Sequence, residues 1–233
     1  ANEAAKAASR VKEPELAAKS HASVSKVYST LGRKSDAKKA ASKAGEAASK
    51  IEEVGTKVRA IRSVADAYAS ADDNGTAVDW LKKAETVAKG ATDTSVKVDL
   101  LREVAAGFTA MKKPEETQRI VKEMEGIAMA ETDPAARVKA MVDLGAALNK
   151  AGDKAEAVKM LNAAVDETGK IEQAHVAVFR MCEAAEALAA SGQGARASEV
   201  LEAARKLTSK ISEPDLQTDA VSKVSRVRQA LAK

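Results

Sequence analysis

The sequence predicts an all-α protein, a solenoid of five full helix-hairpin repeats with a half-repeat at each end. Three observations lead to this fold class: apolar residues recur at helical spacing, the whole pattern repeats at one fixed interval, and alanine dominates the apolar content. Hydrophobic residues make up 45% of the 233 residues and aromatic residues only 2%. Such a composition favours closely packed helices over strands, which prefer β-branched and aromatic side chains.

Two helices are predicted in each repeat, because two apolar stripes recur in register without insertion or deletion. The first helix carries two columns four residues apart, which place them on one helical face. These columns are Val24, Val64, Val104, Leu144 and Ala184, and Tyr28, Tyr68, Phe108, Leu148 and Leu188. The second helix carries Ala41, Leu81, Val121, Leu161 and Leu201, preceded by a column of mostly alanine at 37, 77, 117, 157 and 197.

Polar turns separate the two helices of each repeat, and an acid or amide precedes each first helix. The preceding column is Glu13, Glu53, Asp93, Asp133, Gln173 and Glu213, followed by proline at 14, 134 and 214. An acid complements the helix dipole, and proline suits the first helical position. The predicted repeats therefore span 14–53, 54–93, 94–133, 134–173 and 174–213. A partial helix covers 1–13 and a terminal helix covers 214–233.

At these columns the chain resembles the tetratricopeptide-repeat (TPR) family, whose consensus is W-x2-L-G-x2-Y, then A-x3-F, then P. The fourth repeat matches best, with Met141, Leu144-Gly145, Leu148, Gly152-Asp153, Ala157 and Leu161 at the corresponding positions. The unit is longer than the family's, so each helix is expected to be about 17 residues long. The resemblance implies one right-handed solenoid over residues 1–233.

The resemblance also implies that the first helices line a concave, ligand-binding face. Carried over by column, Arg59, Arg62, Arg102 and Lys139 would form a basic patch on that face, with Asn149 in a further row. Arginine offers a bidentate fork to carboxylates and phosphates, so this patch would suit an acidic peptide or protein segment. An ordinary solvated surface is the alternative. The family's lysine and asparagine carboxylate clamp is not reproduced, because Asp66, Ala106 and Ala146 occupy its row.

The sequence offers no catalytic or metal constellation, and we expect neither an enzyme nor a cofactor. His21 falls in the packing column of Ile61 and Leu101, and Cys182 has no neighbouring base in sequence, so both are interpreted as structural. Gly192-Gln193-Gly194 imitates a dinucleotide fingerprint but aligns with a hairpin turn and follows no strand. No stretch is apolar enough to span a membrane.

Charge is distributed unevenly along the chain. Residues 1–50 hold 11 Lys and Arg against 5 Asp and Glu, an excess of +6, whereas the remainder carries −2. A basic end attracts anionic partners. Nucleic-acid readers interleave such charge with stacking aromatics, and only Tyr28 lies nearby, so protein partners are favoured over nucleic acid. Numbering from Ala1 without methionine slightly favours an exported protein over a cytoplasmic one.

The two ends are predicted to be halves of one repeat. Residues 4–13 align with residues 44–53, at the end of a second helix, and residues 214–233 supply an unpaired first helix. Docking the two ends of neighbouring molecules would assemble a head-to-tail filament through five residues: Ala8, Val11, Val221, Val224 and Leu231. Ordinary capping is the alternative, and Arg228 in an apolar column favours it.

The sequence thus predicts a non-catalytic interaction or structural solenoid. It self-assembles through its ends, or it acts as a monomeric adaptor that binds an acidic segment in its concave groove.

Overall fold

The protein is all-helical in the computed structural model, which describes residues 1–232. Within this range the chain forms twelve α-helices and no strand. The predicted fold class, a succession of helix hairpins, is confirmed. No helix among these residues has both the length and the apolar character needed to cross a membrane.

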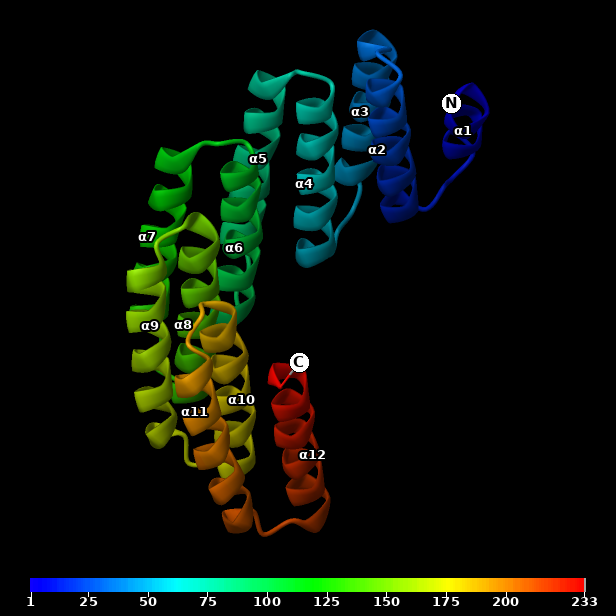
Figure 1. Ribbon diagram of the computed structural model, residues 1–233. Coiled ribbons are helices and arrows are strands. Elements are labelled where there is room, and N and C mark those ends of the chain that lie inside the picture. Colours follow the sequence, from blue (N-terminus) through cyan, green and yellow to red (C-terminus); the bar gives the residue numbers. More distant parts are fainter. Residues whose placement is uncertain (233) are drawn as a thin grey trace. The chain divides into compact units, whose positions relative to one another are not determined.

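Packing divides the chain into two compact units, Ala1–Gln118 and Arg119–Lys233. The first contains α1 (Asn2–Ala8), α2 (Pro14–Thr30), α3 (Lys34–Ser49), α4 (Val54–Ser70), α5 (Asn74–Lys89) and α6 (Thr94–Ala110). The boundary falls within α7 (Pro114–Ala130). The second contains α8 (Pro134–Ala151), α9 (Lys154–Glu167), α10 (Ala174–Ala190), α11 (Gly194–Leu207) and α12 (Pro214–Leu231). Figure 1 shows α2 beside α3 and α10 beside α11 as antiparallel hairpins.

Each predicted repeat opens on a helix, because α2, α4, α6, α8, α10 and α12 begin at the expected residues. Side chains of the preceding acidic column accept backbone N–H groups at four of these starts. Glu13 accepts from Glu15 and Leu16, and Glu53 accepts from Gly55 and Thr56. Asp93 and Asp133 do the same for α6 and α8. Gln173 and Glu213 make no such bond. The acidic column therefore acts mainly by capping helix N–H groups.

The turn between the two helices of a repeat uses one left-handed residue at the same column each time. Its members are Gly32, Asp72, Lys112, Gly152 and Gly192, with φ between 55° and 93°. Glycine adopts this conformation without steric cost, whereas Asp and Lys do not. The column explains why three of the five turns contain glycine.

Helix lengths match the expectation, with one variation. The helices α2, α4, α6, α7 and α10 are each 17 residues long. The helices α9 and α11 are 14 residues long, and each continues as a three-residue 3₁₀ turn, Thr168–Lys170 and Thr208–Lys210. Tightening of the last helical turn into 3₁₀ geometry is common at helix C-termini. Counted with its 3₁₀ turn, the second helix of each of these two repeats therefore has the expected length of 17 residues.

The apolar columns form the core of each unit. In the first unit Val64, Val104 and Phe108 are fully buried; in the second, Leu144 and Leu188 are. Close approach between helices also depends on glycine, and two such glycines lie on first helices. A Cβ placed on Gly107 would lie 2.6 Å from Leu81, and one on Gly145 would lie 2.6 Å from Leu161. Leucine side chains therefore pack directly on the backbone of the facing first helix.

Candidate binding surfaces

The cations predicted for the concave face of the first unit lie on α4 and α6, and two of the three are already neutralised. The Nε atom of Arg59 lies 3.2 Å from Glu103 Oε1, across the two helices. Arg102 binds Asp99 one turn earlier on α6. Each guanidinium therefore has a carboxylate partner within its own unit, which reduces the charge it offers to a ligand.

Arg62 on α4 is different. Its side chain is half-buried, and its Nε atom is covered without any hydrogen-bond partner. No ion pair joins it to a carboxylate among the residues described. A covered guanidinium N–H without an acceptor costs free energy, whereas the outer N–H groups of the guanidinium can still bind a carboxylate. Of the predicted patch in this unit, Arg62 is the cation that retains binding capacity.

A shallow hollow adjoins this row between α2 and α4, with a volume of about 170 Å³. Lys19, Thr56, Arg59 and Ser63 contribute to its lining. Glu15 lines the hollow as well, so α2 and α4 bring an acidic group together with polar and cationic groups to one surface.

The two predicted residues of the second unit are engaged in structural contacts. Lys139 Nζ lies 2.5 Å from Asp143 Oδ2, one turn further along α8. Asn149 donates from Nδ2 to the carbonyl of Ala190 at 3.2 Å and so ties α8 to α10. Sequence reasoning missed Arg180, whose Nε is covered and unpaired while its Nη1 binds both carboxylate oxygens of Glu183. The sequence carries no signal for it, because the other members of its column are Ser20, Ala60, Leu100, Ala140 and Ala220.

His21 and Cys182 are both buried. The packing column of Ile61 and Leu101 predicts this for His21, whereas Cys182 shares its column with Arg62 and Arg102. Burial and the nearby Lys43 lower the pKa of His21, which favours the neutral imidazole. Burial raises the pKa of the Cys182 thiol to about 11, which keeps it protonated and unreactive at neutral pH. Among the residues described, no three His, Cys, Asp or Glu side chains gather to hold a metal ion.

The residues predicted to mediate self-association differ in how far they are exposed to solvent. Ala8 and Val224 are each only 4% exposed, because they pack inside their own units. Neither can be covered further by a second molecule, which corrects the prediction for these two. Val11 and Leu231 are half-buried, and Val221 is 45% exposed. These three remain available at the surface.

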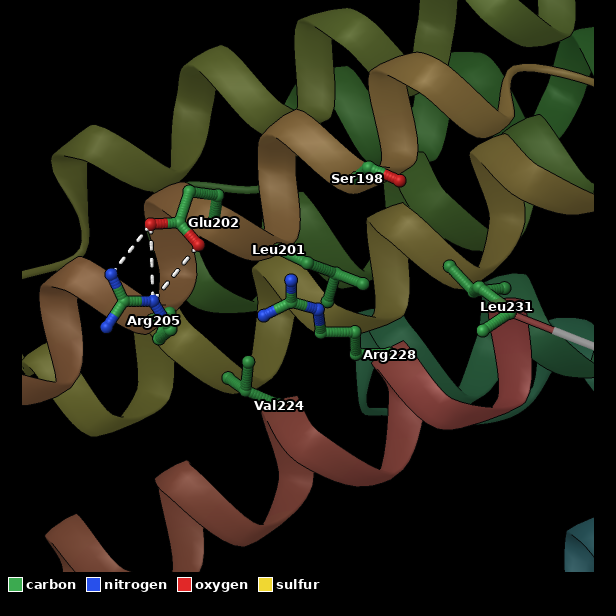
Figure 2. Close-up of a pocket in the computed structure, with 8 residues that line it drawn as sticks. Ser198, Leu201, Glu202, Arg205, Val224, Arg228 and Leu231 are labelled. Carbon is green, nitrogen blue, oxygen red and sulfur yellow. Dashed lines mark hydrogen bonds and ion pairs between the residues drawn. The ribbon is translucent and has the colours of Figure 1, made fainter.

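A groove of about 350 Å³ runs between α11 and α12. Figure 2 shows Leu201, Val224 and Leu231 along it, with Arg228 reaching from α12 toward Leu201. Glu202 and Arg205 form an ion pair at its rim, 2.7 Å between Oε1 and Nη2. The groove is apolar along its floor and charged along its rim.

Comparison with known proteins gives structural likeness only. No family model matches the sequence, and no curated protein matches it. Similar solved structures include the nearly identical TPR-like repeats named for a Podosopora anserina kinesin light chain. They are 19% identical with a TM-score of 0.45, over 86% of this chain and 98% of that one.

Two further solved structures are similar over most of this chain. Ton1535 from Thermococcus onnurineus NA1 is 13% identical with a TM-score of 0.39, over 96% of this chain and 83% of that one. A Rap protein complexed with competence and sporulation factor is 16% identical with a TM-score of 0.38, over 95% and 66%. Likenesses of this strength give no binding property of this chain.

Proposed function

We propose that the chain is a non-catalytic protein-interaction module that binds an acidic segment on the first helices of its first unit. Arg62 is the anchor. The observation that carries the proposal is its covered, unpartnered Nε atom beside two arginines that already have carboxylates.

A carboxylate fits this position for a physical reason. Leaving a covered polar N–H unsatisfied costs about 1–3 kcal/mol, and charge-assisted bonds between arginine and carboxylate are the strongest that side chains make. The covered Nε cannot itself reach a ligand. This half-buried guanidinium has no carboxylate partner among the described residues, so a ligand carboxylate would bind its outer N–H groups. Arg59 and Arg102 would orient it without being released from Glu103 and Asp99. Binding is favoured over catalysis because acid–base or nucleophilic chemistry needs convergent titratable groups, and this row supplies paired charges instead.

The proposal is tested by isothermal titration calorimetry with an unlabelled acidic peptide that lacks aromatic residues, acetyl-Asp-Glu-Ala-Glu-Asp-amide. We expect Arg62→Ala to weaken binding at least tenfold, and Arg62→Lys to restore only part of it because lysine lacks the bidentate fork. Arg226→Ala, which removes an exposed cation from α12, is the matched control. If the wild type and Arg62→Ala bound the peptide with equal affinity, the proposal that Arg62 anchors the acidic segment would be wrong.

Head-to-tail self-assembly is the second candidate function, and the groove between α11 and α12 is the observation that favours it. Val224 and Leu201 are already buried in it, so a helix from another molecule would contact mainly Leu231, which lines the groove and is half-buried. Covering Val221 and Leu231 would contribute about 1.5–3 kcal/mol for each large side chain that became fully buried. That gain is small beside the entropy lost on docking, and Arg228 would have to be displaced.

Light scattering over a range of protein concentrations tests this candidate. Val221→Glu is the informative variant, because Val221 is exposed and its replacement leaves the core intact. If the wild type forms oligomers that Val221→Glu abolishes, self-assembly through this end stands. A wild type that remains monomeric at high micromolar concentration eliminates it.

A further inference from the structure

The first hairpin lacks the large side chains that fill the other repeats. In the column of Trp80, Ile120, Met160 and Val200 it carries Ala40. In the next column it has Ala41 where Leu81 and Leu161 stand, and His21 replaces the aliphatic Ile61. All the buried apolar residues of α3 are alanines, at 37, 40, 41, 44, 47 and 48. The space beside this helix is therefore filled less completely than in the repeats that follow.

Two adjoining hollows result, in the region where α1 packs on α2 beside α3. Their volumes are about 280 and 170 Å³, and they share His21 and Lys43. Ala5, Ala40, Val24 and Tyr28 are among the residues that line the smaller one. We call the pair of hollows the α1/α3 groove.

In the following repeat an aromatic ring occupies the corresponding place. A Cβ built on Gly45 would lie only 2.5 Å from Trp80 Cζ2, so the indole lies directly against α3. Lys83 Nζ lies 4.1 Å from the centre of that ring. When the repeats are aligned, Ala5 corresponds to Gly45, Ala40 to Trp80 and Lys43 to Lys83. The smaller hollow therefore lies at the position that corresponds to Trp80, and Lys43 corresponds to the lysine that stacks on that ring.

The rim of the α1/α3 groove is basic. Lys12 and Lys50 line the larger hollow and Lys39 lines the smaller. All three are exposed, and none forms an ion pair with a described residue. Lys43 makes only a 3.5 Å contact with Ser9 Oγ.

Acidic residues offset little of this charge. Asp36 is occupied by Arg33 at 2.7 Å, which leaves Glu46 as the only other carboxylate in the lining described. The groove thus places uncompensated positive charge beside both hollows.

We propose that the α1/α3 groove binds an acidic peptide segment carrying one aromatic side chain. The ring fills the smaller hollow under Lys43, as Trp80 does under Lys83. Carboxylates on both sides of the ring meet Lys39 at one end and Lys12 and Lys50 at the other. This inference rests on the proposed function as a protein-interaction module, but it uses a different surface from the Arg62 row.

Other anionic ligands fit less well. A flat anionic membrane would leave a ring-sized hollow empty. A mononucleotide would place its phosphate on one side of the ring only, whereas lysines lie beside both hollows. A peptide can carry acids on both sides of one ring, which matches the distribution of charge.

The probe is unlabelled acetyl-Asp-Asp-Trp-Glu-Glu-amide, and its binding is measured by isothermal titration calorimetry. Ala40→Met places in the hollow the side chain that Met160 supplies in the same column. We expect it to weaken binding at least tenfold without lowering the melting temperature. Ser42→Met puts the same residue on an exposed position of α3 and should bind as wild type. Lys39→Glu combined with Lys43→Glu changes exposed positions only and should weaken binding to a similar extent.

Each alternative has its own outcome. Equal binding of a peptide with alanine in place of tryptophan would reduce the groove to a basic surface and overturn the proposal. Tighter binding of adenosine monophosphate than of the peptide would overturn it also. If Arg62→Ala weakened peptide binding and Ala40→Met did not, the peptide would bind beside Arg62. The proposal for the α1/α3 groove would then be wrong, and the proposed function would be supported.

Discussion

Replacing Gly45 with alanine should destabilise the first unit, although alanine is the better helix former. Gly45 lies inside α3, four residues before its last residue, and a Cβ built there would stand 2.5 and 2.7 Å from two carbons of the Trp80 ring. Carbon atoms pack at about 3.5–4.0 Å, so the ring or the helix must shift by about 1 Å. Indole is rigid, and Lys83 lies over the same ring.

The magnitude follows from two opposing terms. Overpacking a core costs about 1–3 kcal/mol, whereas glycine to alanine in a helix gains about 0.8–1.0 kcal/mol. The net expectation is a loss of up to about 2 kcal/mol, or a fall in Tm of several degrees for a chain of this length. Trp80→Leu, which resembles the aliphatic side chains of its column, should relieve the clash. In the Trp80→Leu background, Gly45→Ala should then be neutral or stabilising.

Urea unfolding followed by circular dichroism supplies the measurement, with Gly126→Ala as the matched control. Gly126 lies inside α7 and is exposed, and a Cβ built there would have no neighbouring atom within 4 Å. That variant should gain about 0.5–1 kcal/mol. If Gly45→Ala were stabilising to the same degree as Gly126→Ala, the close approach of Trp80 to α3 would be refuted.

Three further predictions concern buried or paired groups. Because burial lowers the pKa of His21, the unfolded chain binds this proton more tightly, and stability should fall as pH drops below about 6.5. His21→Ile, which introduces the residue type that the next repeat has in this column, should flatten that part of the stability profile; an unchanged profile would show that His21 is not the group responsible. Cys182, fully buried with a thiol pKa of about 11, should resist iodoacetamide at pH 8 until urea unfolds the second unit, and rapid labelling of the native protein would contradict its burial. Arg137 donates to the Glu131 carbonyl and to Glu167, each at 2.7 Å, so Arg137→Ala should cost about 1–2 kcal/mol in urea unfolding, and a neutral result would mean that solvent replaces both bonds.

The sequence determined the helices and their repeat. An uninterrupted repeat interval, an acid or amide before each first helix and apolar columns four residues apart were sufficient to place every first helix at its observed start. These features are local: capping, turn conformation and the face on which a side chain lies depend on neighbours within one or two helical turns. The buried state of Val64, Val104, Leu144 and Leu188 follows from the same columns.

Only the tertiary structure decided which side chains have partners and where space is left. Arg59 meets Glu103, 44 residues away, whereas Arg62, three residues further along the same helix, meets no carboxylate among the residues described. Column alignment gave both the same interpretation, because it fixes the face of a helix and not the side chain opposite.

Val224 likewise shares a column with the buried Val64, yet only its packing showed that no second molecule could use it. Gly45 stands in a column with glutamate and arginine, so its role appears only where the Trp80 ring reaches it. Pairing and packing depend on how far apart neighbouring helices lie and on the volumes of the side chains between them, and periodicity along the chain records neither.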